Sequence, residues 1–585
     1  MYKKTPLPRT RRLRNITGCL LALSVLASAL SSCGKGSTAE TSHASTSAVA
    51  SSSQATAATT TLNATESLPL PTSSTVTYPA AKPLDDLFRT FYEVFVYSYA
   101  DGNGDGIGDF AGLTAKLDYI NDGDPASMND LGANGIWLMP IMPSPTYHKY
   151  DVLDYKAIDP QYGSMADFDA FIAAAHVRGI NVIIDLVLNH TALDHPWFIA
   201  AVDALAKGDF NNPYVSYYNF SQEKKDNTWY QTAAAGWYYE GKFWSGMPDL
   251  NLASEALRTE FENIMEFWLV DRKVDGFRLD AVTEFYSGDD PQNIEVLSWV
   301  NETAKAIQPD AYLVGEAWSG FQVYKQYYRS GIDSLFDFAF ADYSGLTVRS
   351  INLENGRDYA VNLTNAQKAI LEIAPGAINA PFLSNHDTGR LAGFLASDPG
   401  KLRLAAAANL FTSGSSFVYY GEELGMRGAG RDENKRAPLP WGPAGTNGLT
   451  SGPPDMEADG YSYPFGTIAE QLEDPASLLS YYREAIRIRT LYPEIARGLT
   501  ALAPGFDLKA HCAVAKTWTD DEARAQRVLL VLNFSSEANS QVLPSEYSGW
   551  ELVASLPSPD GERVTMDQAS LNFPPFSVAV LKPSA

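Results

Sequence analysis

The sequence contains few cysteines and no excess of positive charge. Only three of the 585 residues are cysteine, at positions 19, 33 and 512, which is too few and too scattered for a disulfide framework or a cysteine-rich zinc site. The chain has 44 Lys and Arg residues against 69 Asp and Glu residues, and its formal net charge is −25. A surface that binds a phosphate backbone would oppose this field. We therefore expect no nucleic-acid partner.

The N-terminus has the pattern of an export signal. Six basic residues between Lys3 and Arg14 precede an apolar stretch, Ile16–Leu30, that is too short to span a bilayer. The segment Leu30-Ser31-Ser32-Cys33 resembles the lipobox of bacterial lipoproteins, in which cleavage leaves a lipid-modified cysteine as the new N-terminus. We expect a signal peptide over residues 1–32 and an extracytoplasmic lipoprotein anchored to the membrane of the cell envelope through Cys33. Loss of the six basic residues would give the mature chain a net charge of −31.

Residues 33–82 consist mostly of Ser, Thr and Ala, with almost no large apolar side chain before about Thr77. Such a segment cannot bury enough surface to offset the entropy lost on ordering. We expect a flexible tether here.

After Pro83, short apolar runs alternate with helical patterns, which is typical of repeated βα units in an α/β protein. The strand ends recur at intervals of roughly one βα unit, about thirty-odd residues. The pattern predicts a (β/α)8 TIM barrel over residues 83–190 and 251–497. The eight expected strands are Tyr92–Tyr97, Gly135–Met139, Asn181–Leu188, Gly276–Leu279, Ala311–Val314, Ser334–Phe338, Ala380–Leu383 and Phe417–Tyr420.

The interval after the third strand is too long for one βα unit. Residues 191–250 are therefore expected to form an inserted subdomain, and they hold about twice the aromatic density of the whole chain. These aromatic side chains suit both a small separate core and a wall on which sugars stack. Residues 498–585 alternate as short strands, for example Arg527–Phe534 and Ser577–Leu581, and predict an all-β sandwich domain.

Polar residues cluster at the carboxyl ends of the expected strands, where the chemistry of such barrels takes place. Strand three ends in Asn189-His190, strand four in Arg278-Leu279-Asp280, strand five in Gly315-Glu316, and strand seven in Asn385-His386-Asp387. No serine or cysteine nucleophile and no histidine cluster for a metal accompanies them. Cleavage of a glycosidic bond requires paired carboxylates, one to donate a proton and one to attack or stabilise the sugar.

These motifs, in this order, resemble the α-amylase family of retaining glycoside hydrolases, family 13, over roughly residues 85–585. Gly135–Pro140, Met247–Asn251 and Tyr419–Glu423 add to the likeness. The resemblance implies that Asp280 is the nucleophile, Glu316 the general acid and base, and Asp387 the third carboxylate, which binds the distorted sugar. It also implies that Arg278 fixes Asp280, while His190, His386 and Tyr150 bind the sugar.

Each of these residues taken alone has an ordinary structural explanation, such as a helix cap, a salt bridge, a hydrogen-bonded core histidine or simple packing. Their joint occurrence at successive strand ends favours the catalytic interpretation.

The segment Asp101–Asp109 has oxygen ligands at alternate positions, with glycines between them that allow a tight turn. This pattern predicts a Ca²⁺ site, and the alternative is a glycine-rich turn with solvated acids. The expected ligands are Asp101, Asn103, Asp105, the carbonyl of Ile107, which the resemblance adds, and Asp109. The sequence leaves open a second calcium site that is common in the family. Asn189 and Asp249 match two of its ligands, but Glu284 stands where the family usually has histidine.

Two classes of function fit the sequence. The first is a lipid-anchored, monomeric α-glucan hydrolase that cleaves α-1,4 bonds of starch, glycogen or maltooligosaccharides by double displacement. The second is a surface glucan-binding protein whose catalysis has decayed. The presence of all three carboxylates favours the enzyme. Neopullulanases, oligo-1,6-glucosidases and transglycosylases share the same residues, so the motifs leave the linkage preference open.

Overall fold

The computed structural model describes residues 78–79, 84–520 and 522–584. The expected signal peptide and tether lie outside these residues, apart from Tyr78 and Pro79. No helix in the described part of the chain is long and apolar enough to cross a membrane.

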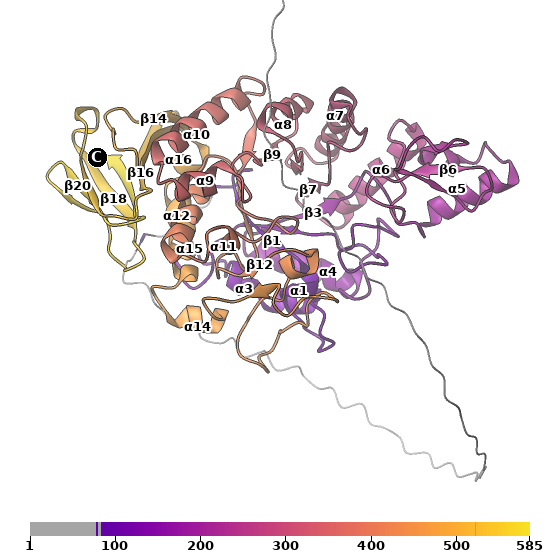
Figure 1. The fold of residues 1–585 in the computed structure, drawn as a ribbon, viewed down its shortest axis with the longest axis horizontal. Coiled ribbons are helices and arrows are strands. Elements are labelled where there is room, and N and C mark those ends of the chain that lie inside the picture. Colours follow the sequence, from indigo (N-terminus) through magenta and orange to yellow (C-terminus); the bar gives the residue numbers. More distant parts are fainter. Residues whose placement is uncertain (1–77, 80–83, 521, 585) are drawn as a thin grey trace, which may run out of the picture. The chain divides into compact units, whose positions relative to one another are not determined.

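Eight parallel strands form one sheet in the order β10-β9-β8-β7-β3-β2-β1-β11. The sheet closes on itself, because Ser415 N donates to Asn379 O and Phe417 N donates to Pro381 O, each at 2.8 Å. The chain thus forms the expected (β/α)8 barrel (Figure 1). Its strands are β1 (Thr90–Val94), β2 (Gly135–Leu138), β3 (Asn181–Leu186), β7 (Gly276–Leu279), β8 (Tyr312–Gly315), β9 (Ser334–Phe336), β10 (Ile378–Ala380) and β11 (Ser416–Tyr419).

Aromatic side chains fill the interior of the barrel. Phe91 of β1 stacks on Phe417 of the adjacent β11 and on Tyr312 of β8, which is not adjacent, with ring centroids 4.8 and 5.1 Å away. Contact between strands that are not neighbours must pass through the interior. Gly135 of β2 leaves space for the ring of Phe91, because a Cβ at this position would lie 2.4 Å from that ring. The interior is a packed core, and the polar side chains of the site lie at the carboxyl ends.

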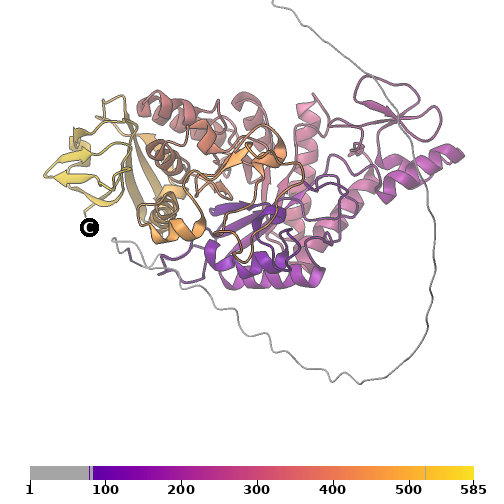
Figure 2. The same cartoon turned by 60° about the horizontal axis from the view of Figure 1, so that its bottom comes forward.

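Helices lie outside the strands (Figures 1 and 2). Side chains cap their first turns: Ser164 and Asp167 form a capping box at α4, and Asp289 accepts from Gln292 N at α7. The longer helices are α4 (Met165–Val177), α6 (Glu255–Glu266), α7 (Asp290–Ile307), α10 (Gly356–Leu371), α12 (Pro399–Leu410) and α15 (Leu478–Leu491). Shorter ones are α1 (Val96–Tyr99), α2 (Phe110–Ala115), α3 (Leu117–Ile120), α8 (Phe321–Tyr327), α9 (Leu346–Asn352), α11 (Leu391–Phe394), α13 (Asp432–Lys435), α14 (Ile468–Glu473) and α16 (Glu494–Arg497).

The segment after β3 has its own small sheet, and its buried side chains belong to the same hydrophobic cluster as those of the barrel. Helix α5 (Pro196–Lys207) precedes the strands β4 (Phe220–Ser221), β5 (Trp229–Gln231) and β6 (Tyr238–Glu240), which pair in the order β4-β6-β5. Phe198 of α5 packs edge-to-face against Tyr218 and Tyr239, at 5.0 and 4.9 Å between ring centroids. Several aromatic residues of the insertion are therefore buried and pack together, but as part of the barrel cluster rather than as the separate core expected from their density.

The C-terminal part is all-β. A five-stranded sheet has the order β14-β15-β16-β21-β18, and a three-stranded sheet has the order β17-β20-β19. Successive side chains of β16 point to opposite faces of the sheet, and both faces are buried. Leu529 and Val531 belong to the core shared with the small sheet, while Leu530 and Leu532 belong to the core shared with the barrel. The strands are β14 (Leu499–Leu502), β15 (His511–Thr519), β16 (Ala525–Asn533), β17 (Asn539–Val542), β18 (Trp550–Leu556), β19 (Thr565–Asp567), β20 (Ser570–Phe573) and β21 (Val578–Pro583). Two pairs of residues, β12 (Arg427–Gly428) and β13 (Tyr461–Ser462), form a further ribbon beside the barrel.

Candidate active site

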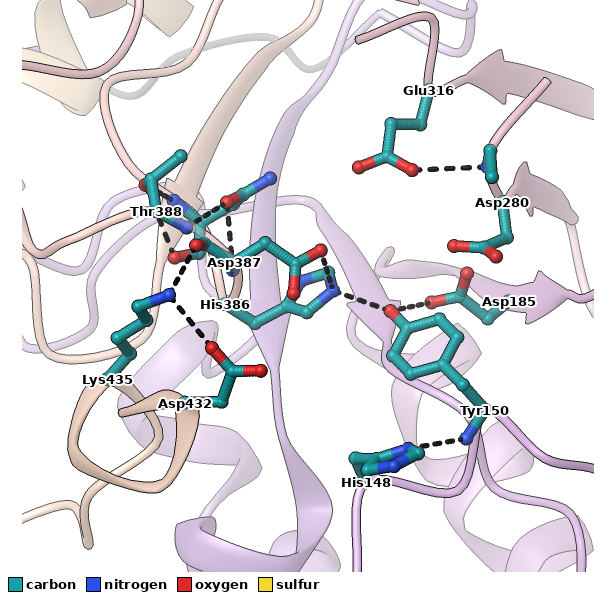
Figure 3. A network of polar contacts seen from close by, with 12 residues as sticks. His148, Tyr150, Asp185, Asp280, Glu316, His386, Asp387, Thr388, Asp432 and Lys435 are labelled. Carbon is teal, nitrogen blue, oxygen red and sulfur yellow. Dashed lines mark hydrogen bonds and ion pairs between the residues drawn. The ribbon is translucent and has the colours of Figure 1, made fainter. Parts of the chain in front are cut away.

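The strand ends bring the expected catalytic residues to one cavity. Asp280 directly follows β7, Glu316 directly follows β8, and Asp387 lies in the loop after β10. Their carboxyl groups point toward a common space (Figure 3). The cavity has a volume of about 620 Å³, and its wall includes His148, Tyr150, His190, Phe243, Trp244, Met247, Asp280, Glu284, Glu316, Trp318, Asp387, Asp432 and Arg436. Arg278 and His386 are fully buried beside this wall.

The buried guanidinium of Arg278 holds three carboxylates. Its Nη1 donates to Asp185 Oδ1 at 2.5 Å and to Asp280 Oδ1 at 2.6 Å. Its Nη2 lies 3.0 Å from Glu316 Oε2. One side chain of β7 therefore contacts both the expected nucleophile and the expected acid.

Glu316 is suited to carry a proton. Burial raises its pKa to about 7; the nearby charge of Arg278 opposes this shift, and the charges of Asp280 and Asp387 add to it. Its Oε2 accepts from Ala281 N at 3.1 Å. Its Oε1 is buried and has no hydrogen-bond partner among the described residues. A protonated carboxyl group with a free oxygen can donate to a glycosidic oxygen.

Asp387 has the opposite character. Burial alone would raise its pKa, but the charges of His386 and Arg436 outweigh this effect and lower the pKa of Asp387 well below its usual range. His386 Nε2 lies 3.0 Å from Asp387 Oδ2, and Arg436 Nη2 lies 2.9 Å from Oδ1. Asp387 is therefore an ionised acceptor held by two cations.

Tyr150 and His190 occupy other parts of the cavity wall. The Tyr150 hydroxyl lies 2.7 Å from His386 Nε2, and the two rings stack with centroids 5.5 Å apart. Lys149 just before it adopts a left-handed φ of 63°, and the Lys149 ammonium pairs with Asp159 at 2.7 Å, which fixes this loop. Both ring nitrogens of His190 are buried and without a partner among the described residues. Burial lowers the pKa of His190, so the imidazole is neutral and can bind a hydroxyl group.

Aromatic side chains line the outer part of the cavity. Phe243 and Trp244 of the inserted segment remain 47% and 48% exposed, and Trp318 after β8 remains 52% exposed. Trp318 stacks on Phe338, with ring centroids 5.2 Å apart, so its position is supported from behind. Phe243 and Trp244 of the insertion therefore form part of the cavity wall, whereas other aromatic residues of the insertion are buried in the hydrophobic core.

Sequence reasoning missed Arg436 and Glu93, which contact Asp387 and His386. Arg436, which binds Asp387, follows α13 and belongs to none of the motifs; a single arginine in a loop carries no recognisable pattern. Glu93 of β1 lies 2.6 Å from His386 Nδ1. A signal for Glu93 was available, because it is a lone acid within the apolar run Phe91-Tyr92-Glu93-Val94-Phe95.

The loop of residues 101–109 offers only oxygen ligands, but its carboxylates accept backbone hydrogen bonds. Asp101 Oδ2 accepts from Gly106 N at 2.7 Å, Asp105 Oδ1 from Ile107 N at 2.8 Å, and Asp109 Oδ2 from Gly102 N at 3.1 Å. Within the described ranges, no group of three or more His, Cys, Asp or Glu side chains is arranged to hold a metal ion. The chemistry of the donors nevertheless fits Ca²⁺, which prefers hard oxygen ligands.

The residues at the positions of the family's second calcium site pair with one another and with a lysine. Asn189 Nδ2 donates to Asp249 Oδ1 at 3.1 Å, and Lys242 N donates to Asp249 Oδ2 at 2.9 Å. The Lys242 ammonium lies 2.9 Å from Glu284 Oε2. Burial raises the pKa of Asp249 to about 8.

Comparisons with known proteins agree on one family. Residues 93–498 match the family model "Alpha amylase, catalytic domain". "Alpha-amylase 3" of Dictyoglomus thermophilum is 38% identical over 421 residues, which cover 70% of this chain and 78% of that protein. "Oligo-1,6-glucosidase" of Parageobacillus thermoglucosidasius is 28% identical over 495 residues, covering 70% of this chain and 84% of that protein. The solved structure "Eubacterium rectale Amy13B" has a TM-score of 0.81 at 40% identity and covers 86% of this chain and 97% of that one.

Proposed function

Because the chain belongs to the alpha-amylase family of glycoside hydrolases, and is an α-glucan hydrolase, we propose that three carboxylates of the cavity carry out its reaction. Asp280 is the nucleophile, Glu316 is the general acid and then the general base, and Asp387 binds the hydroxyl groups of the distorted sugar. Tyr150, His190 and His386 bind the same sugar, and Arg278 fixes Asp280.

In the first step, Glu316 transfers its proton to the glycosidic oxygen while an Asp280 oxygen attacks the anomeric carbon. The bond to the leaving sugar breaks, and a glycosyl ester of Asp280 forms. In the second step, Glu316, now a carboxylate, takes a proton from water, and the water oxygen attacks the anomeric carbon. Asp280 leaves as a carboxylate, and the product keeps the α-configuration.

The observation that carries this assignment is the shared guanidinium. Asp280 and Glu316 contact the two terminal nitrogens of Arg278, which favours the separation of about 5–5.5 Å between carboxyl groups found in retaining enzymes over the about 6.5–9.5 Å of inverting ones. The test is to follow the anomeric configuration of fresh products by proton NMR. Release of the α-anomer first supports the assignment, and release of the β-anomer first would overturn it.

The linkage preference can be determined by product analysis. We propose α-1,4 cleavage of starch, glycogen or maltooligosaccharides, with neopullulanase-type or oligo-1,6-glucosidase-type action as the alternative. The relative named for oligo-1,6-glucosidase activity supports keeping that alternative. Assays on soluble starch, pullulan and isomaltose in parallel distinguish them, because each substrate offers a different arrangement of linkages.

We further propose that Ca²⁺ binds in the 101–109 loop through Asp101, Asn103, Asp105, Asp109 and the carbonyl of Ile107. Calcium would supply structural stability to the connection after β1. The all-oxygen donors at alternate positions support this ion.

We also propose that the mature protein is a monomeric lipoprotein of the cell envelope, anchored through Cys33. The basic and apolar stretches before Leu30-Ser31-Ser32-Cys33 support this location.

A further inference from the structure

We infer that Glu93 is a positioning residue of the catalytic site: it holds His386 in the doubly protonated form, and this imidazolium orients Asp387 and keeps it ionised. The inference rests on the role proposed above for Asp387.

Glu93 is the single charged side chain of β1. It is the fourth residue of β1 and is 1% exposed. Its Oε1 lies 2.6 Å from His386 Nδ1 and accepts a longer hydrogen bond, 3.4 Å, from His386 N. In the described part of the chain, His386 is its one ion-pair partner. A buried carboxylate costs free energy relative to a neutral amide, and the ion pair with His386 offsets part of that cost.

The second nitrogen of His386 also meets acceptors. His386 Nε2 lies 3.0 Å from Asp387 Oδ2 and 2.7 Å from the hydroxyl of Tyr150. A neutral imidazole donates from only one nitrogen, so it would turn a lone pair toward one of the two carboxylates. The imidazolium donates from both nitrogens and satisfies Glu93 and Asp387 together.

The electrostatics of the site agree with this geometry. Burial alone would lower the pKa of His386, but Asp387 and Glu93 outweigh it and raise the pKa to about 9. Arg436 is a second cation beside Asp387, whereas the ion pair of Glu93 among the described residues is with His386 alone. The charged and titratable groups around His386 are Glu93 of β1, Tyr150 after β2, Asp185 of β3, Arg278 of β7, Glu316 after β8, Asp387 of its own loop and Arg436 after α13.

The consequence for catalysis is a site that keeps Asp387 fixed over a wide range of pH. When His386 loses one proton, Asp387 loses one of its two cationic partners. A lone pair of the neutral imidazole then faces either Glu93 or Asp387. Removing the charge of Glu93 makes that proton easier to lose. The alkaline limit of substrate binding should therefore move to lower pH.

The test is the pH profile of Glu93→Gln on α-maltosyl fluoride. Fluoride leaves without needing a proton, so kcat/KM for this substrate does not depend on proton donation by Glu316. For the wild type we expect kcat/KM to hold up to about pH 9, where His386 titrates. For Glu93→Gln we expect the alkaline limb to lie at least one pH unit lower, where one unit of pKa corresponds to a tenfold change in protonation. At pH 5.5 we expect kcat/KM of this variant to stay within about threefold of the wild type.

Two further variants separate charge from structure. Glu93→Asp keeps the carboxylate and should keep the alkaline limb near that of the wild type, even if kcat falls. His176→Gln removes another histidine that pairs with a carboxylate, Asp275 at 2.9 Å, and should leave the profile unchanged. Profiles of Glu93→Gln and the wild type that differ by one constant factor at every pH would overturn the inference.

Nitrogen-15 NMR of protein labelled at histidine measures the protonation state of His386 in the absence of substrate turnover. We expect the wild-type His386 resonances to be those of an imidazolium at pH 7. A neutral His386 at pH 7 would overturn the inference even if Glu93→Gln does not fold. Failure of the proposed catalytic roles is distinguishable, because it would appear as turnover of α-maltosyl fluoride by Asp280→Asn.

Discussion

The guanidinium of Arg278 joins Asp280 to Glu316: Nη1 lies 2.6 Å from Asp280 Oδ1, and Nη2 lies 3.0 Å from Glu316 Oε2. The two carboxyl groups sit in different loops, after β7 and after β8, and this single side chain sets their relative position. Since Arg278 is fully buried, the pair is held by the barrel core rather than by mobile surface contacts. The assignment of nucleophile and acid can therefore be tested one residue at a time.

Asp280→Asn should abolish hydrolysis of soluble starch while leaving the fold intact. The amide has nearly the same volume and can still accept from Arg278, but it is a poor nucleophile. We expect kcat to fall by about 10⁴-fold or more, measured by reducing-sugar release, with an unchanged circular dichroism spectrum. Asp209→Asn, at an exposed acid of the inserted segment, is the matched control. Substantial turnover by Asp280→Asn would place the nucleophile elsewhere.

The activity on maltooligosaccharides should fall as the pH rises through about 7. The raised pKa of Glu316 means that its carboxyl group is protonated below about pH 7 and ionised above it, and only the protonated form can serve as the acid. A plot of kcat/KM against pH should show this alkaline limb. Glu316→Gln should lower kcat/KM by about 10²–10⁴-fold and remove the limb. If that variant kept the wild-type limb, another group would be the acid.

The convergence of the carboxylates on one cavity could be predicted because it follows from barrel geometry. Asp280 and Glu316 stand at the ends of expected strands, and parallel strands bring those ends together. Arg436 could not be predicted, because it reaches Asp387 from 49 residues away along the chain, and no local pattern encodes that contact.

Strand limits were less accurate than strand order. The first strand was expected over Tyr92–Tyr97, but β1 ends at Val94, since Val96–Tyr99 form a helical turn. The seventh was expected over Ala380–Leu383, but β10 ends at Ala380. In both places the side chains beyond the strand are buried as well, so hydrophobicity alone does not mark where the strand stops.

Removal of calcium should lower the melting temperature before it changes the chemistry. An ion that binds only the folded state stabilises it by about 2.7 kcal/mol when its free concentration is about 100-fold above the dissociation constant. We expect a fall of a few degrees after chelation, measured by calorimetry, and the same fall in Asp105→Ala with calcium present. Asp124→Ala is the matched control, because Asp124 Oδ1 also accepts a backbone hydrogen bond two residues on. Equal melting temperatures for metal-free and calcium-loaded protein would contradict the site.

Attachment to the membrane should depend on Cys33 alone. A mature chain of net charge −31 is repelled by anionic headgroups, so no basic patch assists a lipid anchor. Wild-type protein should therefore partition into the detergent phase, whereas Cys33→Ser should give released active enzyme or an unprocessed precursor. Cys19→Ser is the control, because residue 19 would be removed with the signal peptide. Wild-type protein that is wholly soluble and begins at or after Gly34 would instead indicate an ordinary secreted enzyme.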